Sequence, residues 1–94
     1  SIGADGTLLA LHTRVAGPSL RAEFSPAGIK PGEVDGASVQ NLAEARYRIE
    51  AHRIDYALRH FAIPVAPWRS VGATHNAFFL ECFLDEVAQA TSQD

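Results

Sequence analysis

The chain is poor in the residues that define several classes of protein. Its one cysteine, Cys82, excludes an internal disulfide framework, and we expect it to behave as a small hydrophobe within an apolar helical run. No apolar run approaches the roughly 18 residues that a membrane-spanning helix needs. Eight basic residues against eleven acidic ones give a formal net charge of −3. This acidic balance argues against a nucleic-acid partner.

The remaining composition is that of one small folded unit. With 47% hydrophobic and 20% charged residues, the chain reads as globular, and its 94 residues allow one domain with a thin core. It starts at Ser1 without a methionine and stops just past a predicted helix, so we expect a piece of a longer protein. The sequence shows no signal-peptide pattern and leaves the compartment open between cytoplasm and periplasm.

Alternating apolar residues predict strands in the first and middle thirds of the chain. Residues 7–15 alternate between an apolar and a partly polar face. A second alternating run begins near residue 45 and changes phase after His52 and Arg53, which predicts two short strands or one bulged strand ending before Pro64. Between these runs, residues 20–45 read as a long excursion with one helical turn near 38–43. We expect the strands to be antiparallel.

Helical periodicity runs from Thr74 to about Thr91. The first three turns are apolar nearly all round, apart from Glu81. A helix of this kind cannot be enclosed in so small a monomer, so we expect its Phe78, Phe79 and Phe83 surface to pair with another copy or with further chain. The predicted fold class is α+β, with short antiparallel strands packed on one long, apolar C-terminal helix.

The loop before this helix, residues 68–73, supports two interpretations. In the first it is a tight strand-to-helix turn, in which Gly72 supplies an unusual backbone angle and Thr74 caps the helix. In the second it is a seat for an anion such as phosphate, because backbone N–H groups and the positive end of the helix dipole converge there and Arg69 adds a charged donor. The pattern alone favours the simple turn.

Other candidate groups predict no catalytic or metal site. The four histidines form no pair at ligand spacing, and Cys82 has no cysteine partner, so we predict no metal site. Glu81 and Asp85 lie four residues apart on one helix face, where pairing with a strand arginine is the simpler interpretation than acid–base catalysis. The chain has no serine-nucleophile motif and no glycine-rich phosphate loop.

Three groups of segments carry a resemblance to a known family. The most specific is Ile-Pro-Val-x-Pro-Trp-Arg-Ser-Val-Gly over residues 63–72, followed by Asn-Ala-Phe over 76–78 and Glu81-x-Phe83-x-Asp85-Glu86. The supporting segments are 5–8, His12-x-Arg14, 17–19, Tyr47-x-Ile49 and 53–56. With these segments, nearly the whole chain resembles the large subunit of the xanthine dehydrogenase and aldehyde oxidase superfamily, in particular the molybdopterin-binding subunits of the isoquinoline 1-oxidoreductase beta-subunit type.

The resemblance implies a molybdenum hydroxylase acting on an aldehyde or an N-heteroaromatic ring such as isoquinoline, with water as the source of oxygen. It makes residues 1–94 a partial domain of the molybdopterin-binding subunit. It also implies that this loop faces the molybdenum-molybdopterin cofactor, the contributing residues being Trp68, Arg69, Ser70, Val71 and Gly72.

The implied partners are the remainder of the large subunit, an iron–sulfur electron-transfer subunit and a small-molecule substrate. The catalytic glutamate of the family matches none of the residues in this chain, so we expect the 94-residue piece by itself to be inactive.

 The competing hypothesis is a small stand-alone α+β module that dimerises through its apolar helix. A reading frame that continues far beyond Asp94 would favour the enzyme, and a stop codon there would favour the module.

Overall fold

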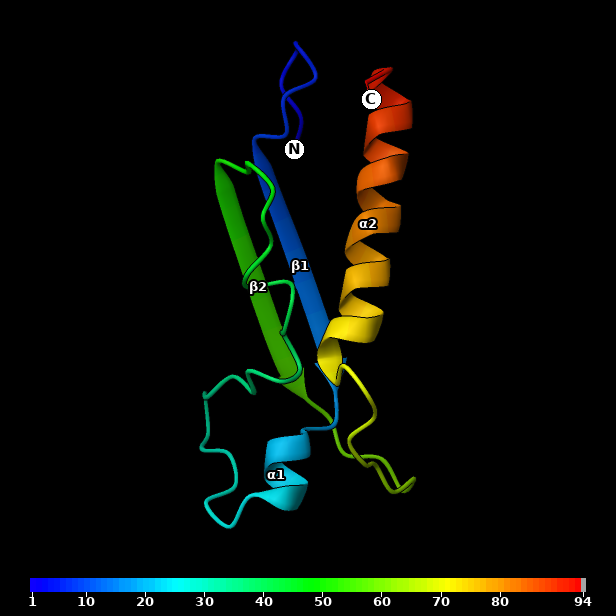
Figure 1. Ribbon diagram of the computed structural model, residues 1–94. Coiled ribbons are helices and arrows are strands. Elements are labelled where there is room, and N and C mark those ends of the chain that lie inside the picture. The colour runs from blue at the N-terminus through cyan, green and yellow to red at the C-terminus, as the bar shows by residue number, and fades with distance from the viewer. Residues whose placement is uncertain (94) are drawn as a thin grey trace.

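The computed structural model describes residues 1–93, and their elements follow one another as a strand, a short helix, a strand and a long helix (Figure 1). The molecule is elongated, with extents of 49 × 25 × 22 Å. The predicted α+β class is confirmed. The bounds of the elements are β1 Ala10–Gly17, α1 Leu20–Phe24, β2 Ala51–Leu58 and α2 Gly72–Thr91.

The two strands form a parallel sheet, so the antiparallel prediction is wrong. Ala10 lies opposite Ala51 and Gly17 lies opposite Leu58, with an unbroken register between them. Parallel strands need a crossover connection of a dozen residues or more. Residues 18–50 supply that connection, and their length is itself the sequence signal that disfavours a hairpin.

The alternation predicted for each strand is confirmed in part. In β1 the side chains of Leu11, Thr13 and Val15 turn inward, while His12 and Arg14 are exposed. The middle run forms one uninterrupted strand, so the prediction of a bulge or a break after His52 and Arg53 is wrong. The first part of the run, residues 45–50, is irregular, and the change of phase falls near the start of β2, at His52 and Arg53.

The crossover begins with α1, which the sequence did not predict. Ser19 caps this helix, since its Oγ accepts a hydrogen bond from the Ala22 N–H at 3.0 Å. The same hydroxyl donates to the buried carboxylate of Asp35 at 2.6 Å. Asp35 Oδ1 also accepts from the Ala37 N–H at 2.9 Å. This network fixes the path of the chain where it turns back toward β2.

The ionisation of Asp35 reflects two opposing influences. Burial favours the neutral acid, but the hydrogen bonds from Ser19 and from the N–H groups of Ala37 and Arg21 stabilise the carboxylate. The hydrogen bonds outweigh burial and hold the pKa of Asp35 below its usual value. Asp35 therefore stays charged in the folded chain at neutral pH.

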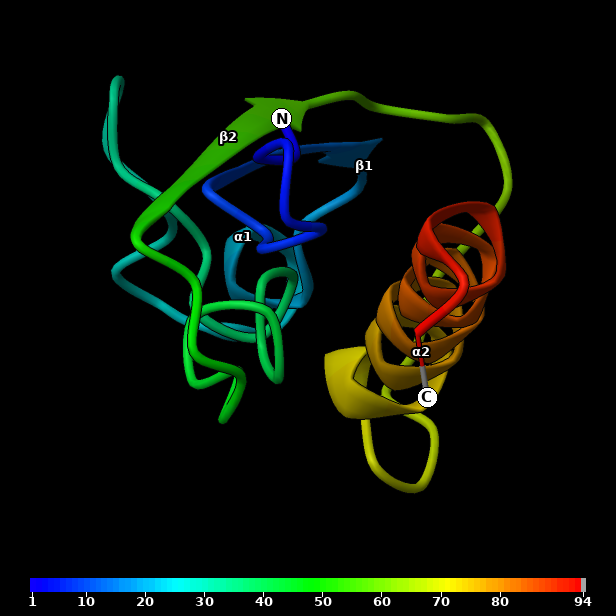
Figure 2. The ribbon, with the colours of Figure 1, turned by 90° about the horizontal axis from the view of Figure 1, so that it is seen from above.

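The hydrophobic core joins β1, the crossover and α2 through one leucine from each. Leu11, Leu42 and Leu80 are buried together. The predicted helical turn near 38–43 is present only as an isolated turn, in which the Ala43 N–H donates to the Val39 carbonyl. Seen from above, α2 stands to one side of the sheet (Figure 2). Partly buried residues surround the three leucines: Val15, Ala45, Ile49, Ile54 and Leu84.

The helix α2 contacts the crossover through small and polar side chains. The Asn76 amide, 1% exposed, donates to the carbonyl oxygens of Ser38 at 2.9 Å and Gln40 at 3.0 Å. A Cβ at Gly72 would overlap the carbonyl oxygen of Ala37. The helix can therefore approach the crossover this closely only because position 72 has no side chain.

Three aromatic side chains of α2 are uncovered, as predicted. Phe78, Phe79 and Phe83 are 65%, 62% and 44% exposed. Cys82, expected to behave as a small hydrophobe in the apolar run, is exposed as well. Among residues 1–93, no helix is long and apolar enough to cross a membrane.

Candidate functional site

The loop predicted to carry function is a tight turn at the start of α2. The Val71 N–H donates to the Trp68 carbonyl at 2.9 Å, and the Ala73 N–H donates to the Ser70 carbonyl at 2.9 Å. Ser70 and Val71 both have positive φ, 68° and 46°. A β-branched residue rarely adopts such an angle, and holding it costs on the order of 1–3 kcal/mol.

The details of this turn differ from the simple turn that the sequence predicted. Gly72 lies within the helix, where any side chain would overlap the carbonyl oxygen of Ala37. The positive φ angles fall on Ser70 and Val71 instead. Thr74 does not cap the helix, because its Oγ1 donates to the Arg69 carbonyl at 3.1 Å. The residue at the N-cap position is Val71, which offers no side-chain acceptor.

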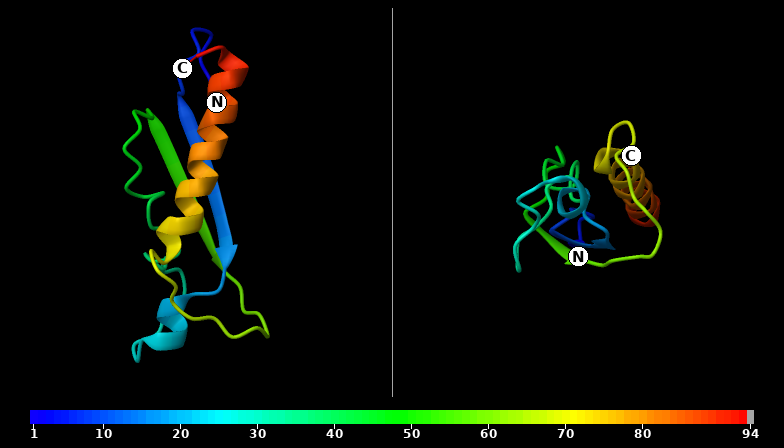
Figure 3. Two further views of the ribbon diagram at one scale, coloured as in Figure 1. Left: turned by 45° about the vertical axis from the view of Figure 1, so that its right-hand side comes forward. Right: turned by 90° about the horizontal axis from the view of Figure 1, so that it is seen from below.

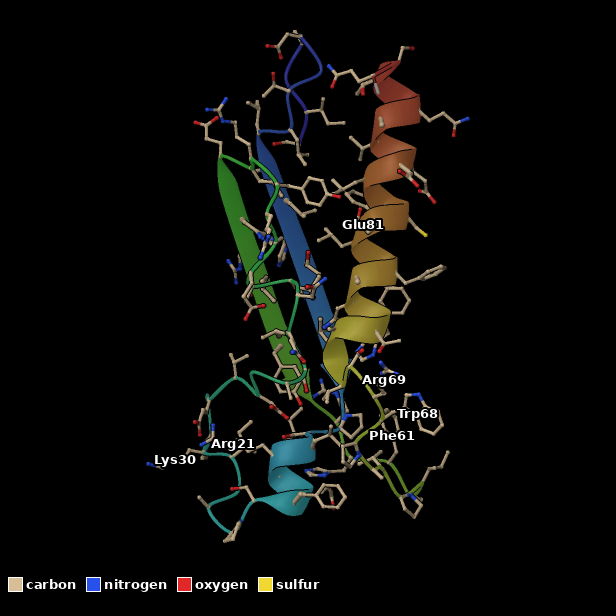
Figure 4. All side chains as sticks on the ribbon, viewed as in Figure 1. Arg21, Lys30, Phe61, Trp68, Arg69 and Glu81 are labelled. Atoms are coloured by element: carbon tan, nitrogen blue, oxygen red, sulfur yellow. The ribbon has the colours of Figure 1, made fainter. Side chains whose placement is uncertain are left out.

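The electrostatics of the turn suit an anion. The first turn of α2 contains no acidic residue and receives no side-chain cap. The positive end of the helix dipole is therefore not neutralised from within the helix. Arg69 is exposed beside it, and Trp68 is 83% exposed (Figure 4). No ion pair formed by Arg69 is found among the described residues.

The five predicted loop residues divide between two surfaces. Trp68, Val71 and Gly72 line a groove of about 740 Å³ between β1 and α2. Arg69 and Ser70 lie outside the groove lining. An anion held by Arg69 and a molecule occupying the groove would meet at this turn.

The groove runs along β1 and has an aromatic wall, which the sequence reasoning did not foresee. Its lining includes consecutive residues from Leu11 to Pro18, so both faces of β1 border it. On the α2 side it is bordered by His75, Phe79 and Phe83, which recur every four residues along one stripe. In Figure 1, α2 lies beyond the edge of β1 that faces away from β2, and in the left view of Figure 3 it crosses in front of the strands.

The outer face of the sheet carries a cluster of charged side chains. Asp55 accepts from Arg53 Nε at 2.8 Å and pairs with His12 Nε2 at 2.7 Å, and the Arg14 guanidinium lies 3.7 Å away. Hydrogen bonds from Arg53 and His12 lower the pKa of Asp55 to about 2. The carboxylate of Asp55 therefore pairs with three basic side chains.

The remaining candidate groups take structural roles. Glu81 accepts a hydrogen bond from the hydroxyl of Tyr47, and this bond raises the pKa of that tyrosine. The expected pairing of Glu81 with a strand arginine is therefore wrong. Within residues 1–93, no group of three His, Cys, Asp or Glu side chains comes together as metal ligands.

Comparison of the chain with known proteins found no matching family, no matching curated protein and no matching solved structure.

Proposed function

We propose that this chain is a segment of a molybdenum hydroxylase large subunit, in which the turn over residues 68–72 borders the molybdopterin cofactor. One observation carries the proposal. The long helix α2 begins without an acidic residue or a side-chain cap, and the exposed guanidinium of Arg69 lies at that start. The sequence of the turn is also the part of the chain that most specifically resembles this superfamily.

The residues of the turn fit an anionic cofactor. Arg69 would bind an anionic group through its planar guanidinium, and the backbone at the start of α2 would contribute N–H donors. Trp68 and Val71 would present apolar surface to the same ligand and exclude water from it. When bound, the cofactor would supply the oxidative hydroxylation of an aldehyde or N-heteroaromatic carbon, with water providing the oxygen.

The catalytic base of such an enzyme must come from outside this chain. Glu81 is engaged by Tyr47 on the crossover, and Asp85 and Glu86 are exposed residues further along α2. The proposal therefore includes the remainder of the large subunit and an iron–sulfur electron-transfer partner. The 94-residue chain would contribute binding surface and no catalytic group.

The test uses the protein encoded by the complete reading frame that contains this chain. Its molybdenum content would be measured by elemental analysis after expression with molybdate, together with hydroxylation of isoquinoline and of an aldehyde. We expect bound molybdenum in the unaltered protein and a loss of molybdenum or turnover in Arg69→Ala. Arg59→Ala removes an exposed arginine from the same connection and should change neither.

Two results would overturn the proposal. One is a purified, folded protein without molybdenum under these conditions. The other is equal metal content and turnover in the unaltered protein and Arg69→Ala.

A second candidate function rests on the exposed aromatic side of α2. Phe78 and Phe79 are each more than half exposed in the isolated chain, and a surface of this kind is typical of an interaction site. The alternative is therefore a small α+β module that forms a homodimer through this helix. Light scattering that shows a monomer at all concentrations would reject this alternative.

A further inference from the structure

The strand β1 has one edge without a hydrogen-bonding partner. The Ala51 N–H donates to the Leu9 carbonyl, and the Arg59 N–H donates to the Gly17 carbonyl. In a parallel ladder alternate residues direct their backbone groups to the same neighbour. The backbone N–H and C=O groups of the odd-numbered residues of β1 therefore point toward β2. Those of His12, Arg14 and Ala16 point toward the other edge of the strand. Residues 1–93 supply no backbone partner to these three.

The N-terminal residue already occupies the beginning of this edge. The Ser1 amino group donates to the Ala10 carbonyl at 2.6 Å, and the Ala10 N–H donates to the Ser1 carbonyl at 3.3 Å. This exchange of two bonds is the pairing of an antiparallel ladder. The Leu9 N–H reaches the same Ser1 carbonyl at 3.1 Å, as in a β-bulge. A strand continuing this row along the edge would run antiparallel to β1.

The groove provides the space for such a strand. It follows β1 from Leu11 to Pro18, and its volume of about 740 Å³ lies between β1 and the aromatic stripe of α2. Side chains on an added strand alternate between the two faces of the sheet. Those opposite Thr13 and Val15 would lie on the inner face, toward Phe79 and Phe83. Those opposite His12 and Arg14 would share the outer face with the charged cluster.

The basic side chains on that outer face favour a partner strand with acidic residues. Arg14 and Arg53 have side chains that are 71% and 73% exposed. His12 and both arginines form their ion pairs with the same carboxylate, that of Asp55. Directly opposed charges of opposite sign stabilise neighbouring strands, and like charges destabilise them. An acidic residue opposite Arg14 would therefore be favoured over a basic one.

We propose that the free edge of β1 and the groove beside it bind an extended polypeptide strand, antiparallel to β1, with acidic residues facing His12 and Arg14 and apolar residues facing Phe79 and Phe83. This mode of recognition draws affinity from backbone hydrogen bonds and specificity from alternate side chains. The groove shares Trp68 and Val71 with the proposed cofactor surface, but strand binding does not use Arg69 and is tested without the cofactor, so its failure is distinguishable from failure of the proposed function.

The test uses the isotope-labelled 94-residue chain and a short synthetic peptide of alternating valine and glutamate, with three glutamates to pair with His12, Arg14 and Ala16. Binding would be followed by nuclear magnetic resonance shifts and amide exchange. We expect the amides of His12, Arg14 and Ala16 to become protected, while those of β2 change little. Replacing the glutamates by lysine should weaken binding.

Two matched peptides test the predicted register. Methylating the backbone nitrogens of the glutamates removes the donors that face β1, and this should weaken binding by more than about tenfold. Methylating the valine nitrogens alters groups that point away from β1 and should have a much smaller effect. Equal weakening by the two peptides would overturn the proposal.

Variants of the chain provide the complementary test. Ala16→Pro removes a donor from the free edge and should weaken binding, whereas Ala16→Val retains the donor and should not. Because Ala16→Pro can also disturb folding, the peptide pair decides the question if that variant unfolds. Absence of binding by every peptide would overturn the proposal. So would self-association that protects the same β1 amides, since the occupant would then be a second copy.

Discussion

Along α2, a glycine and an asparagine are buried while three phenylalanines are exposed, which is the reverse of the usual relation between residue type and burial. Gly72, Asn76 and Leu80 are the buried residues of α2, whereas Phe78 on the other side of the helix is exposed, as is Phe79, which borders the groove. The buried side is fixed by a close backbone approach and two amide hydrogen bonds. In this chain, specific geometry determines which residues of the helix are covered, and its aromatic side chains stay exposed.

The largest expected effect comes from filling the close approach. Gly72→Ala places a methyl group against the Ala37 carbonyl, and we expect it to lower the free energy of unfolding by about 3 kcal/mol. Gly36→Ala is the matched control, since a Cβ there meets no atom within 4 Å. Urea denaturation of both variants measures the difference. Equal stability of the two would mean that α2 does not approach Ala37 closely.

The next effect concerns the amide on the same side. Asn76→Ala leaves the carbonyls of Ser38 and Gln40 without their shared donor, and we expect a loss of about 2 kcal/mol. The exposed Gln89 on α2 provides the control substitution, Gln89→Ala. If the two variants lose the same free energy of unfolding in urea, the hydrogen bonds of Asn76 do not stabilise the contact between α2 and the crossover.

A smaller effect is expected at Asp35, which fixes the crossover that α2 contacts. Its pKa is lowered in the folded chain. Its contribution is therefore fully present above the unfolded value of about 3.9 and is lost as the pH falls through the lower folded value. Asp35→Asn should cost about 1 kcal/mol at pH 7, and the difference from the unaltered chain should shrink below pH 4. A difference independent of pH would contradict a role for the charge.

The smallest expected effect on stability lies on the exposed side. Phe78→Ser should change the free energy of unfolding by less than about 0.5 kcal/mol, because the side chain is 65% exposed. It should also reduce self-association measured by light scattering. Thr74→Ser, at another exposed position on α2, is the control. A loss above 1 kcal/mol would show that Phe78 is packed within a single chain.

The sequence predicted the fold class and α2 well, because periodicity depends on local residue spacing. It also predicted the exposed Phe78, Phe79 and Phe83 surface. It failed on strand direction, since that depends on how the crossover packs, and on α1, whose five residues are too few to show a helical period. The Ser19 and Asp35 pair that fixes α1 joins residues far apart in sequence.

The candidate site was predictable at the level of the turn and unpredictable in its geometry. Pro67 and Gly72 marked a bend before a helix, but the positive φ angles fall on Ser70 and Val71. The contact that selects Gly72 lies on the crossover at Ala37. The groove combines β1 with a stripe of α2, and no local pattern in the sequence brings those two elements together.

The parallel register has a consequence for how the chain folds as it is synthesised. Every contact of the ladder joins β1 to a strand that leaves the ribosome only after the whole crossover, since Ala10 pairs with Ala51 and Gly17 with Leu58. Closing so long a loop precedes any gain from strand pairing, and folds dominated by such distant contacts form slowly. During that interval β1 has two open edges instead of one. A chaperone that recognises extended apolar segments would have its best opportunity to bind β1 then.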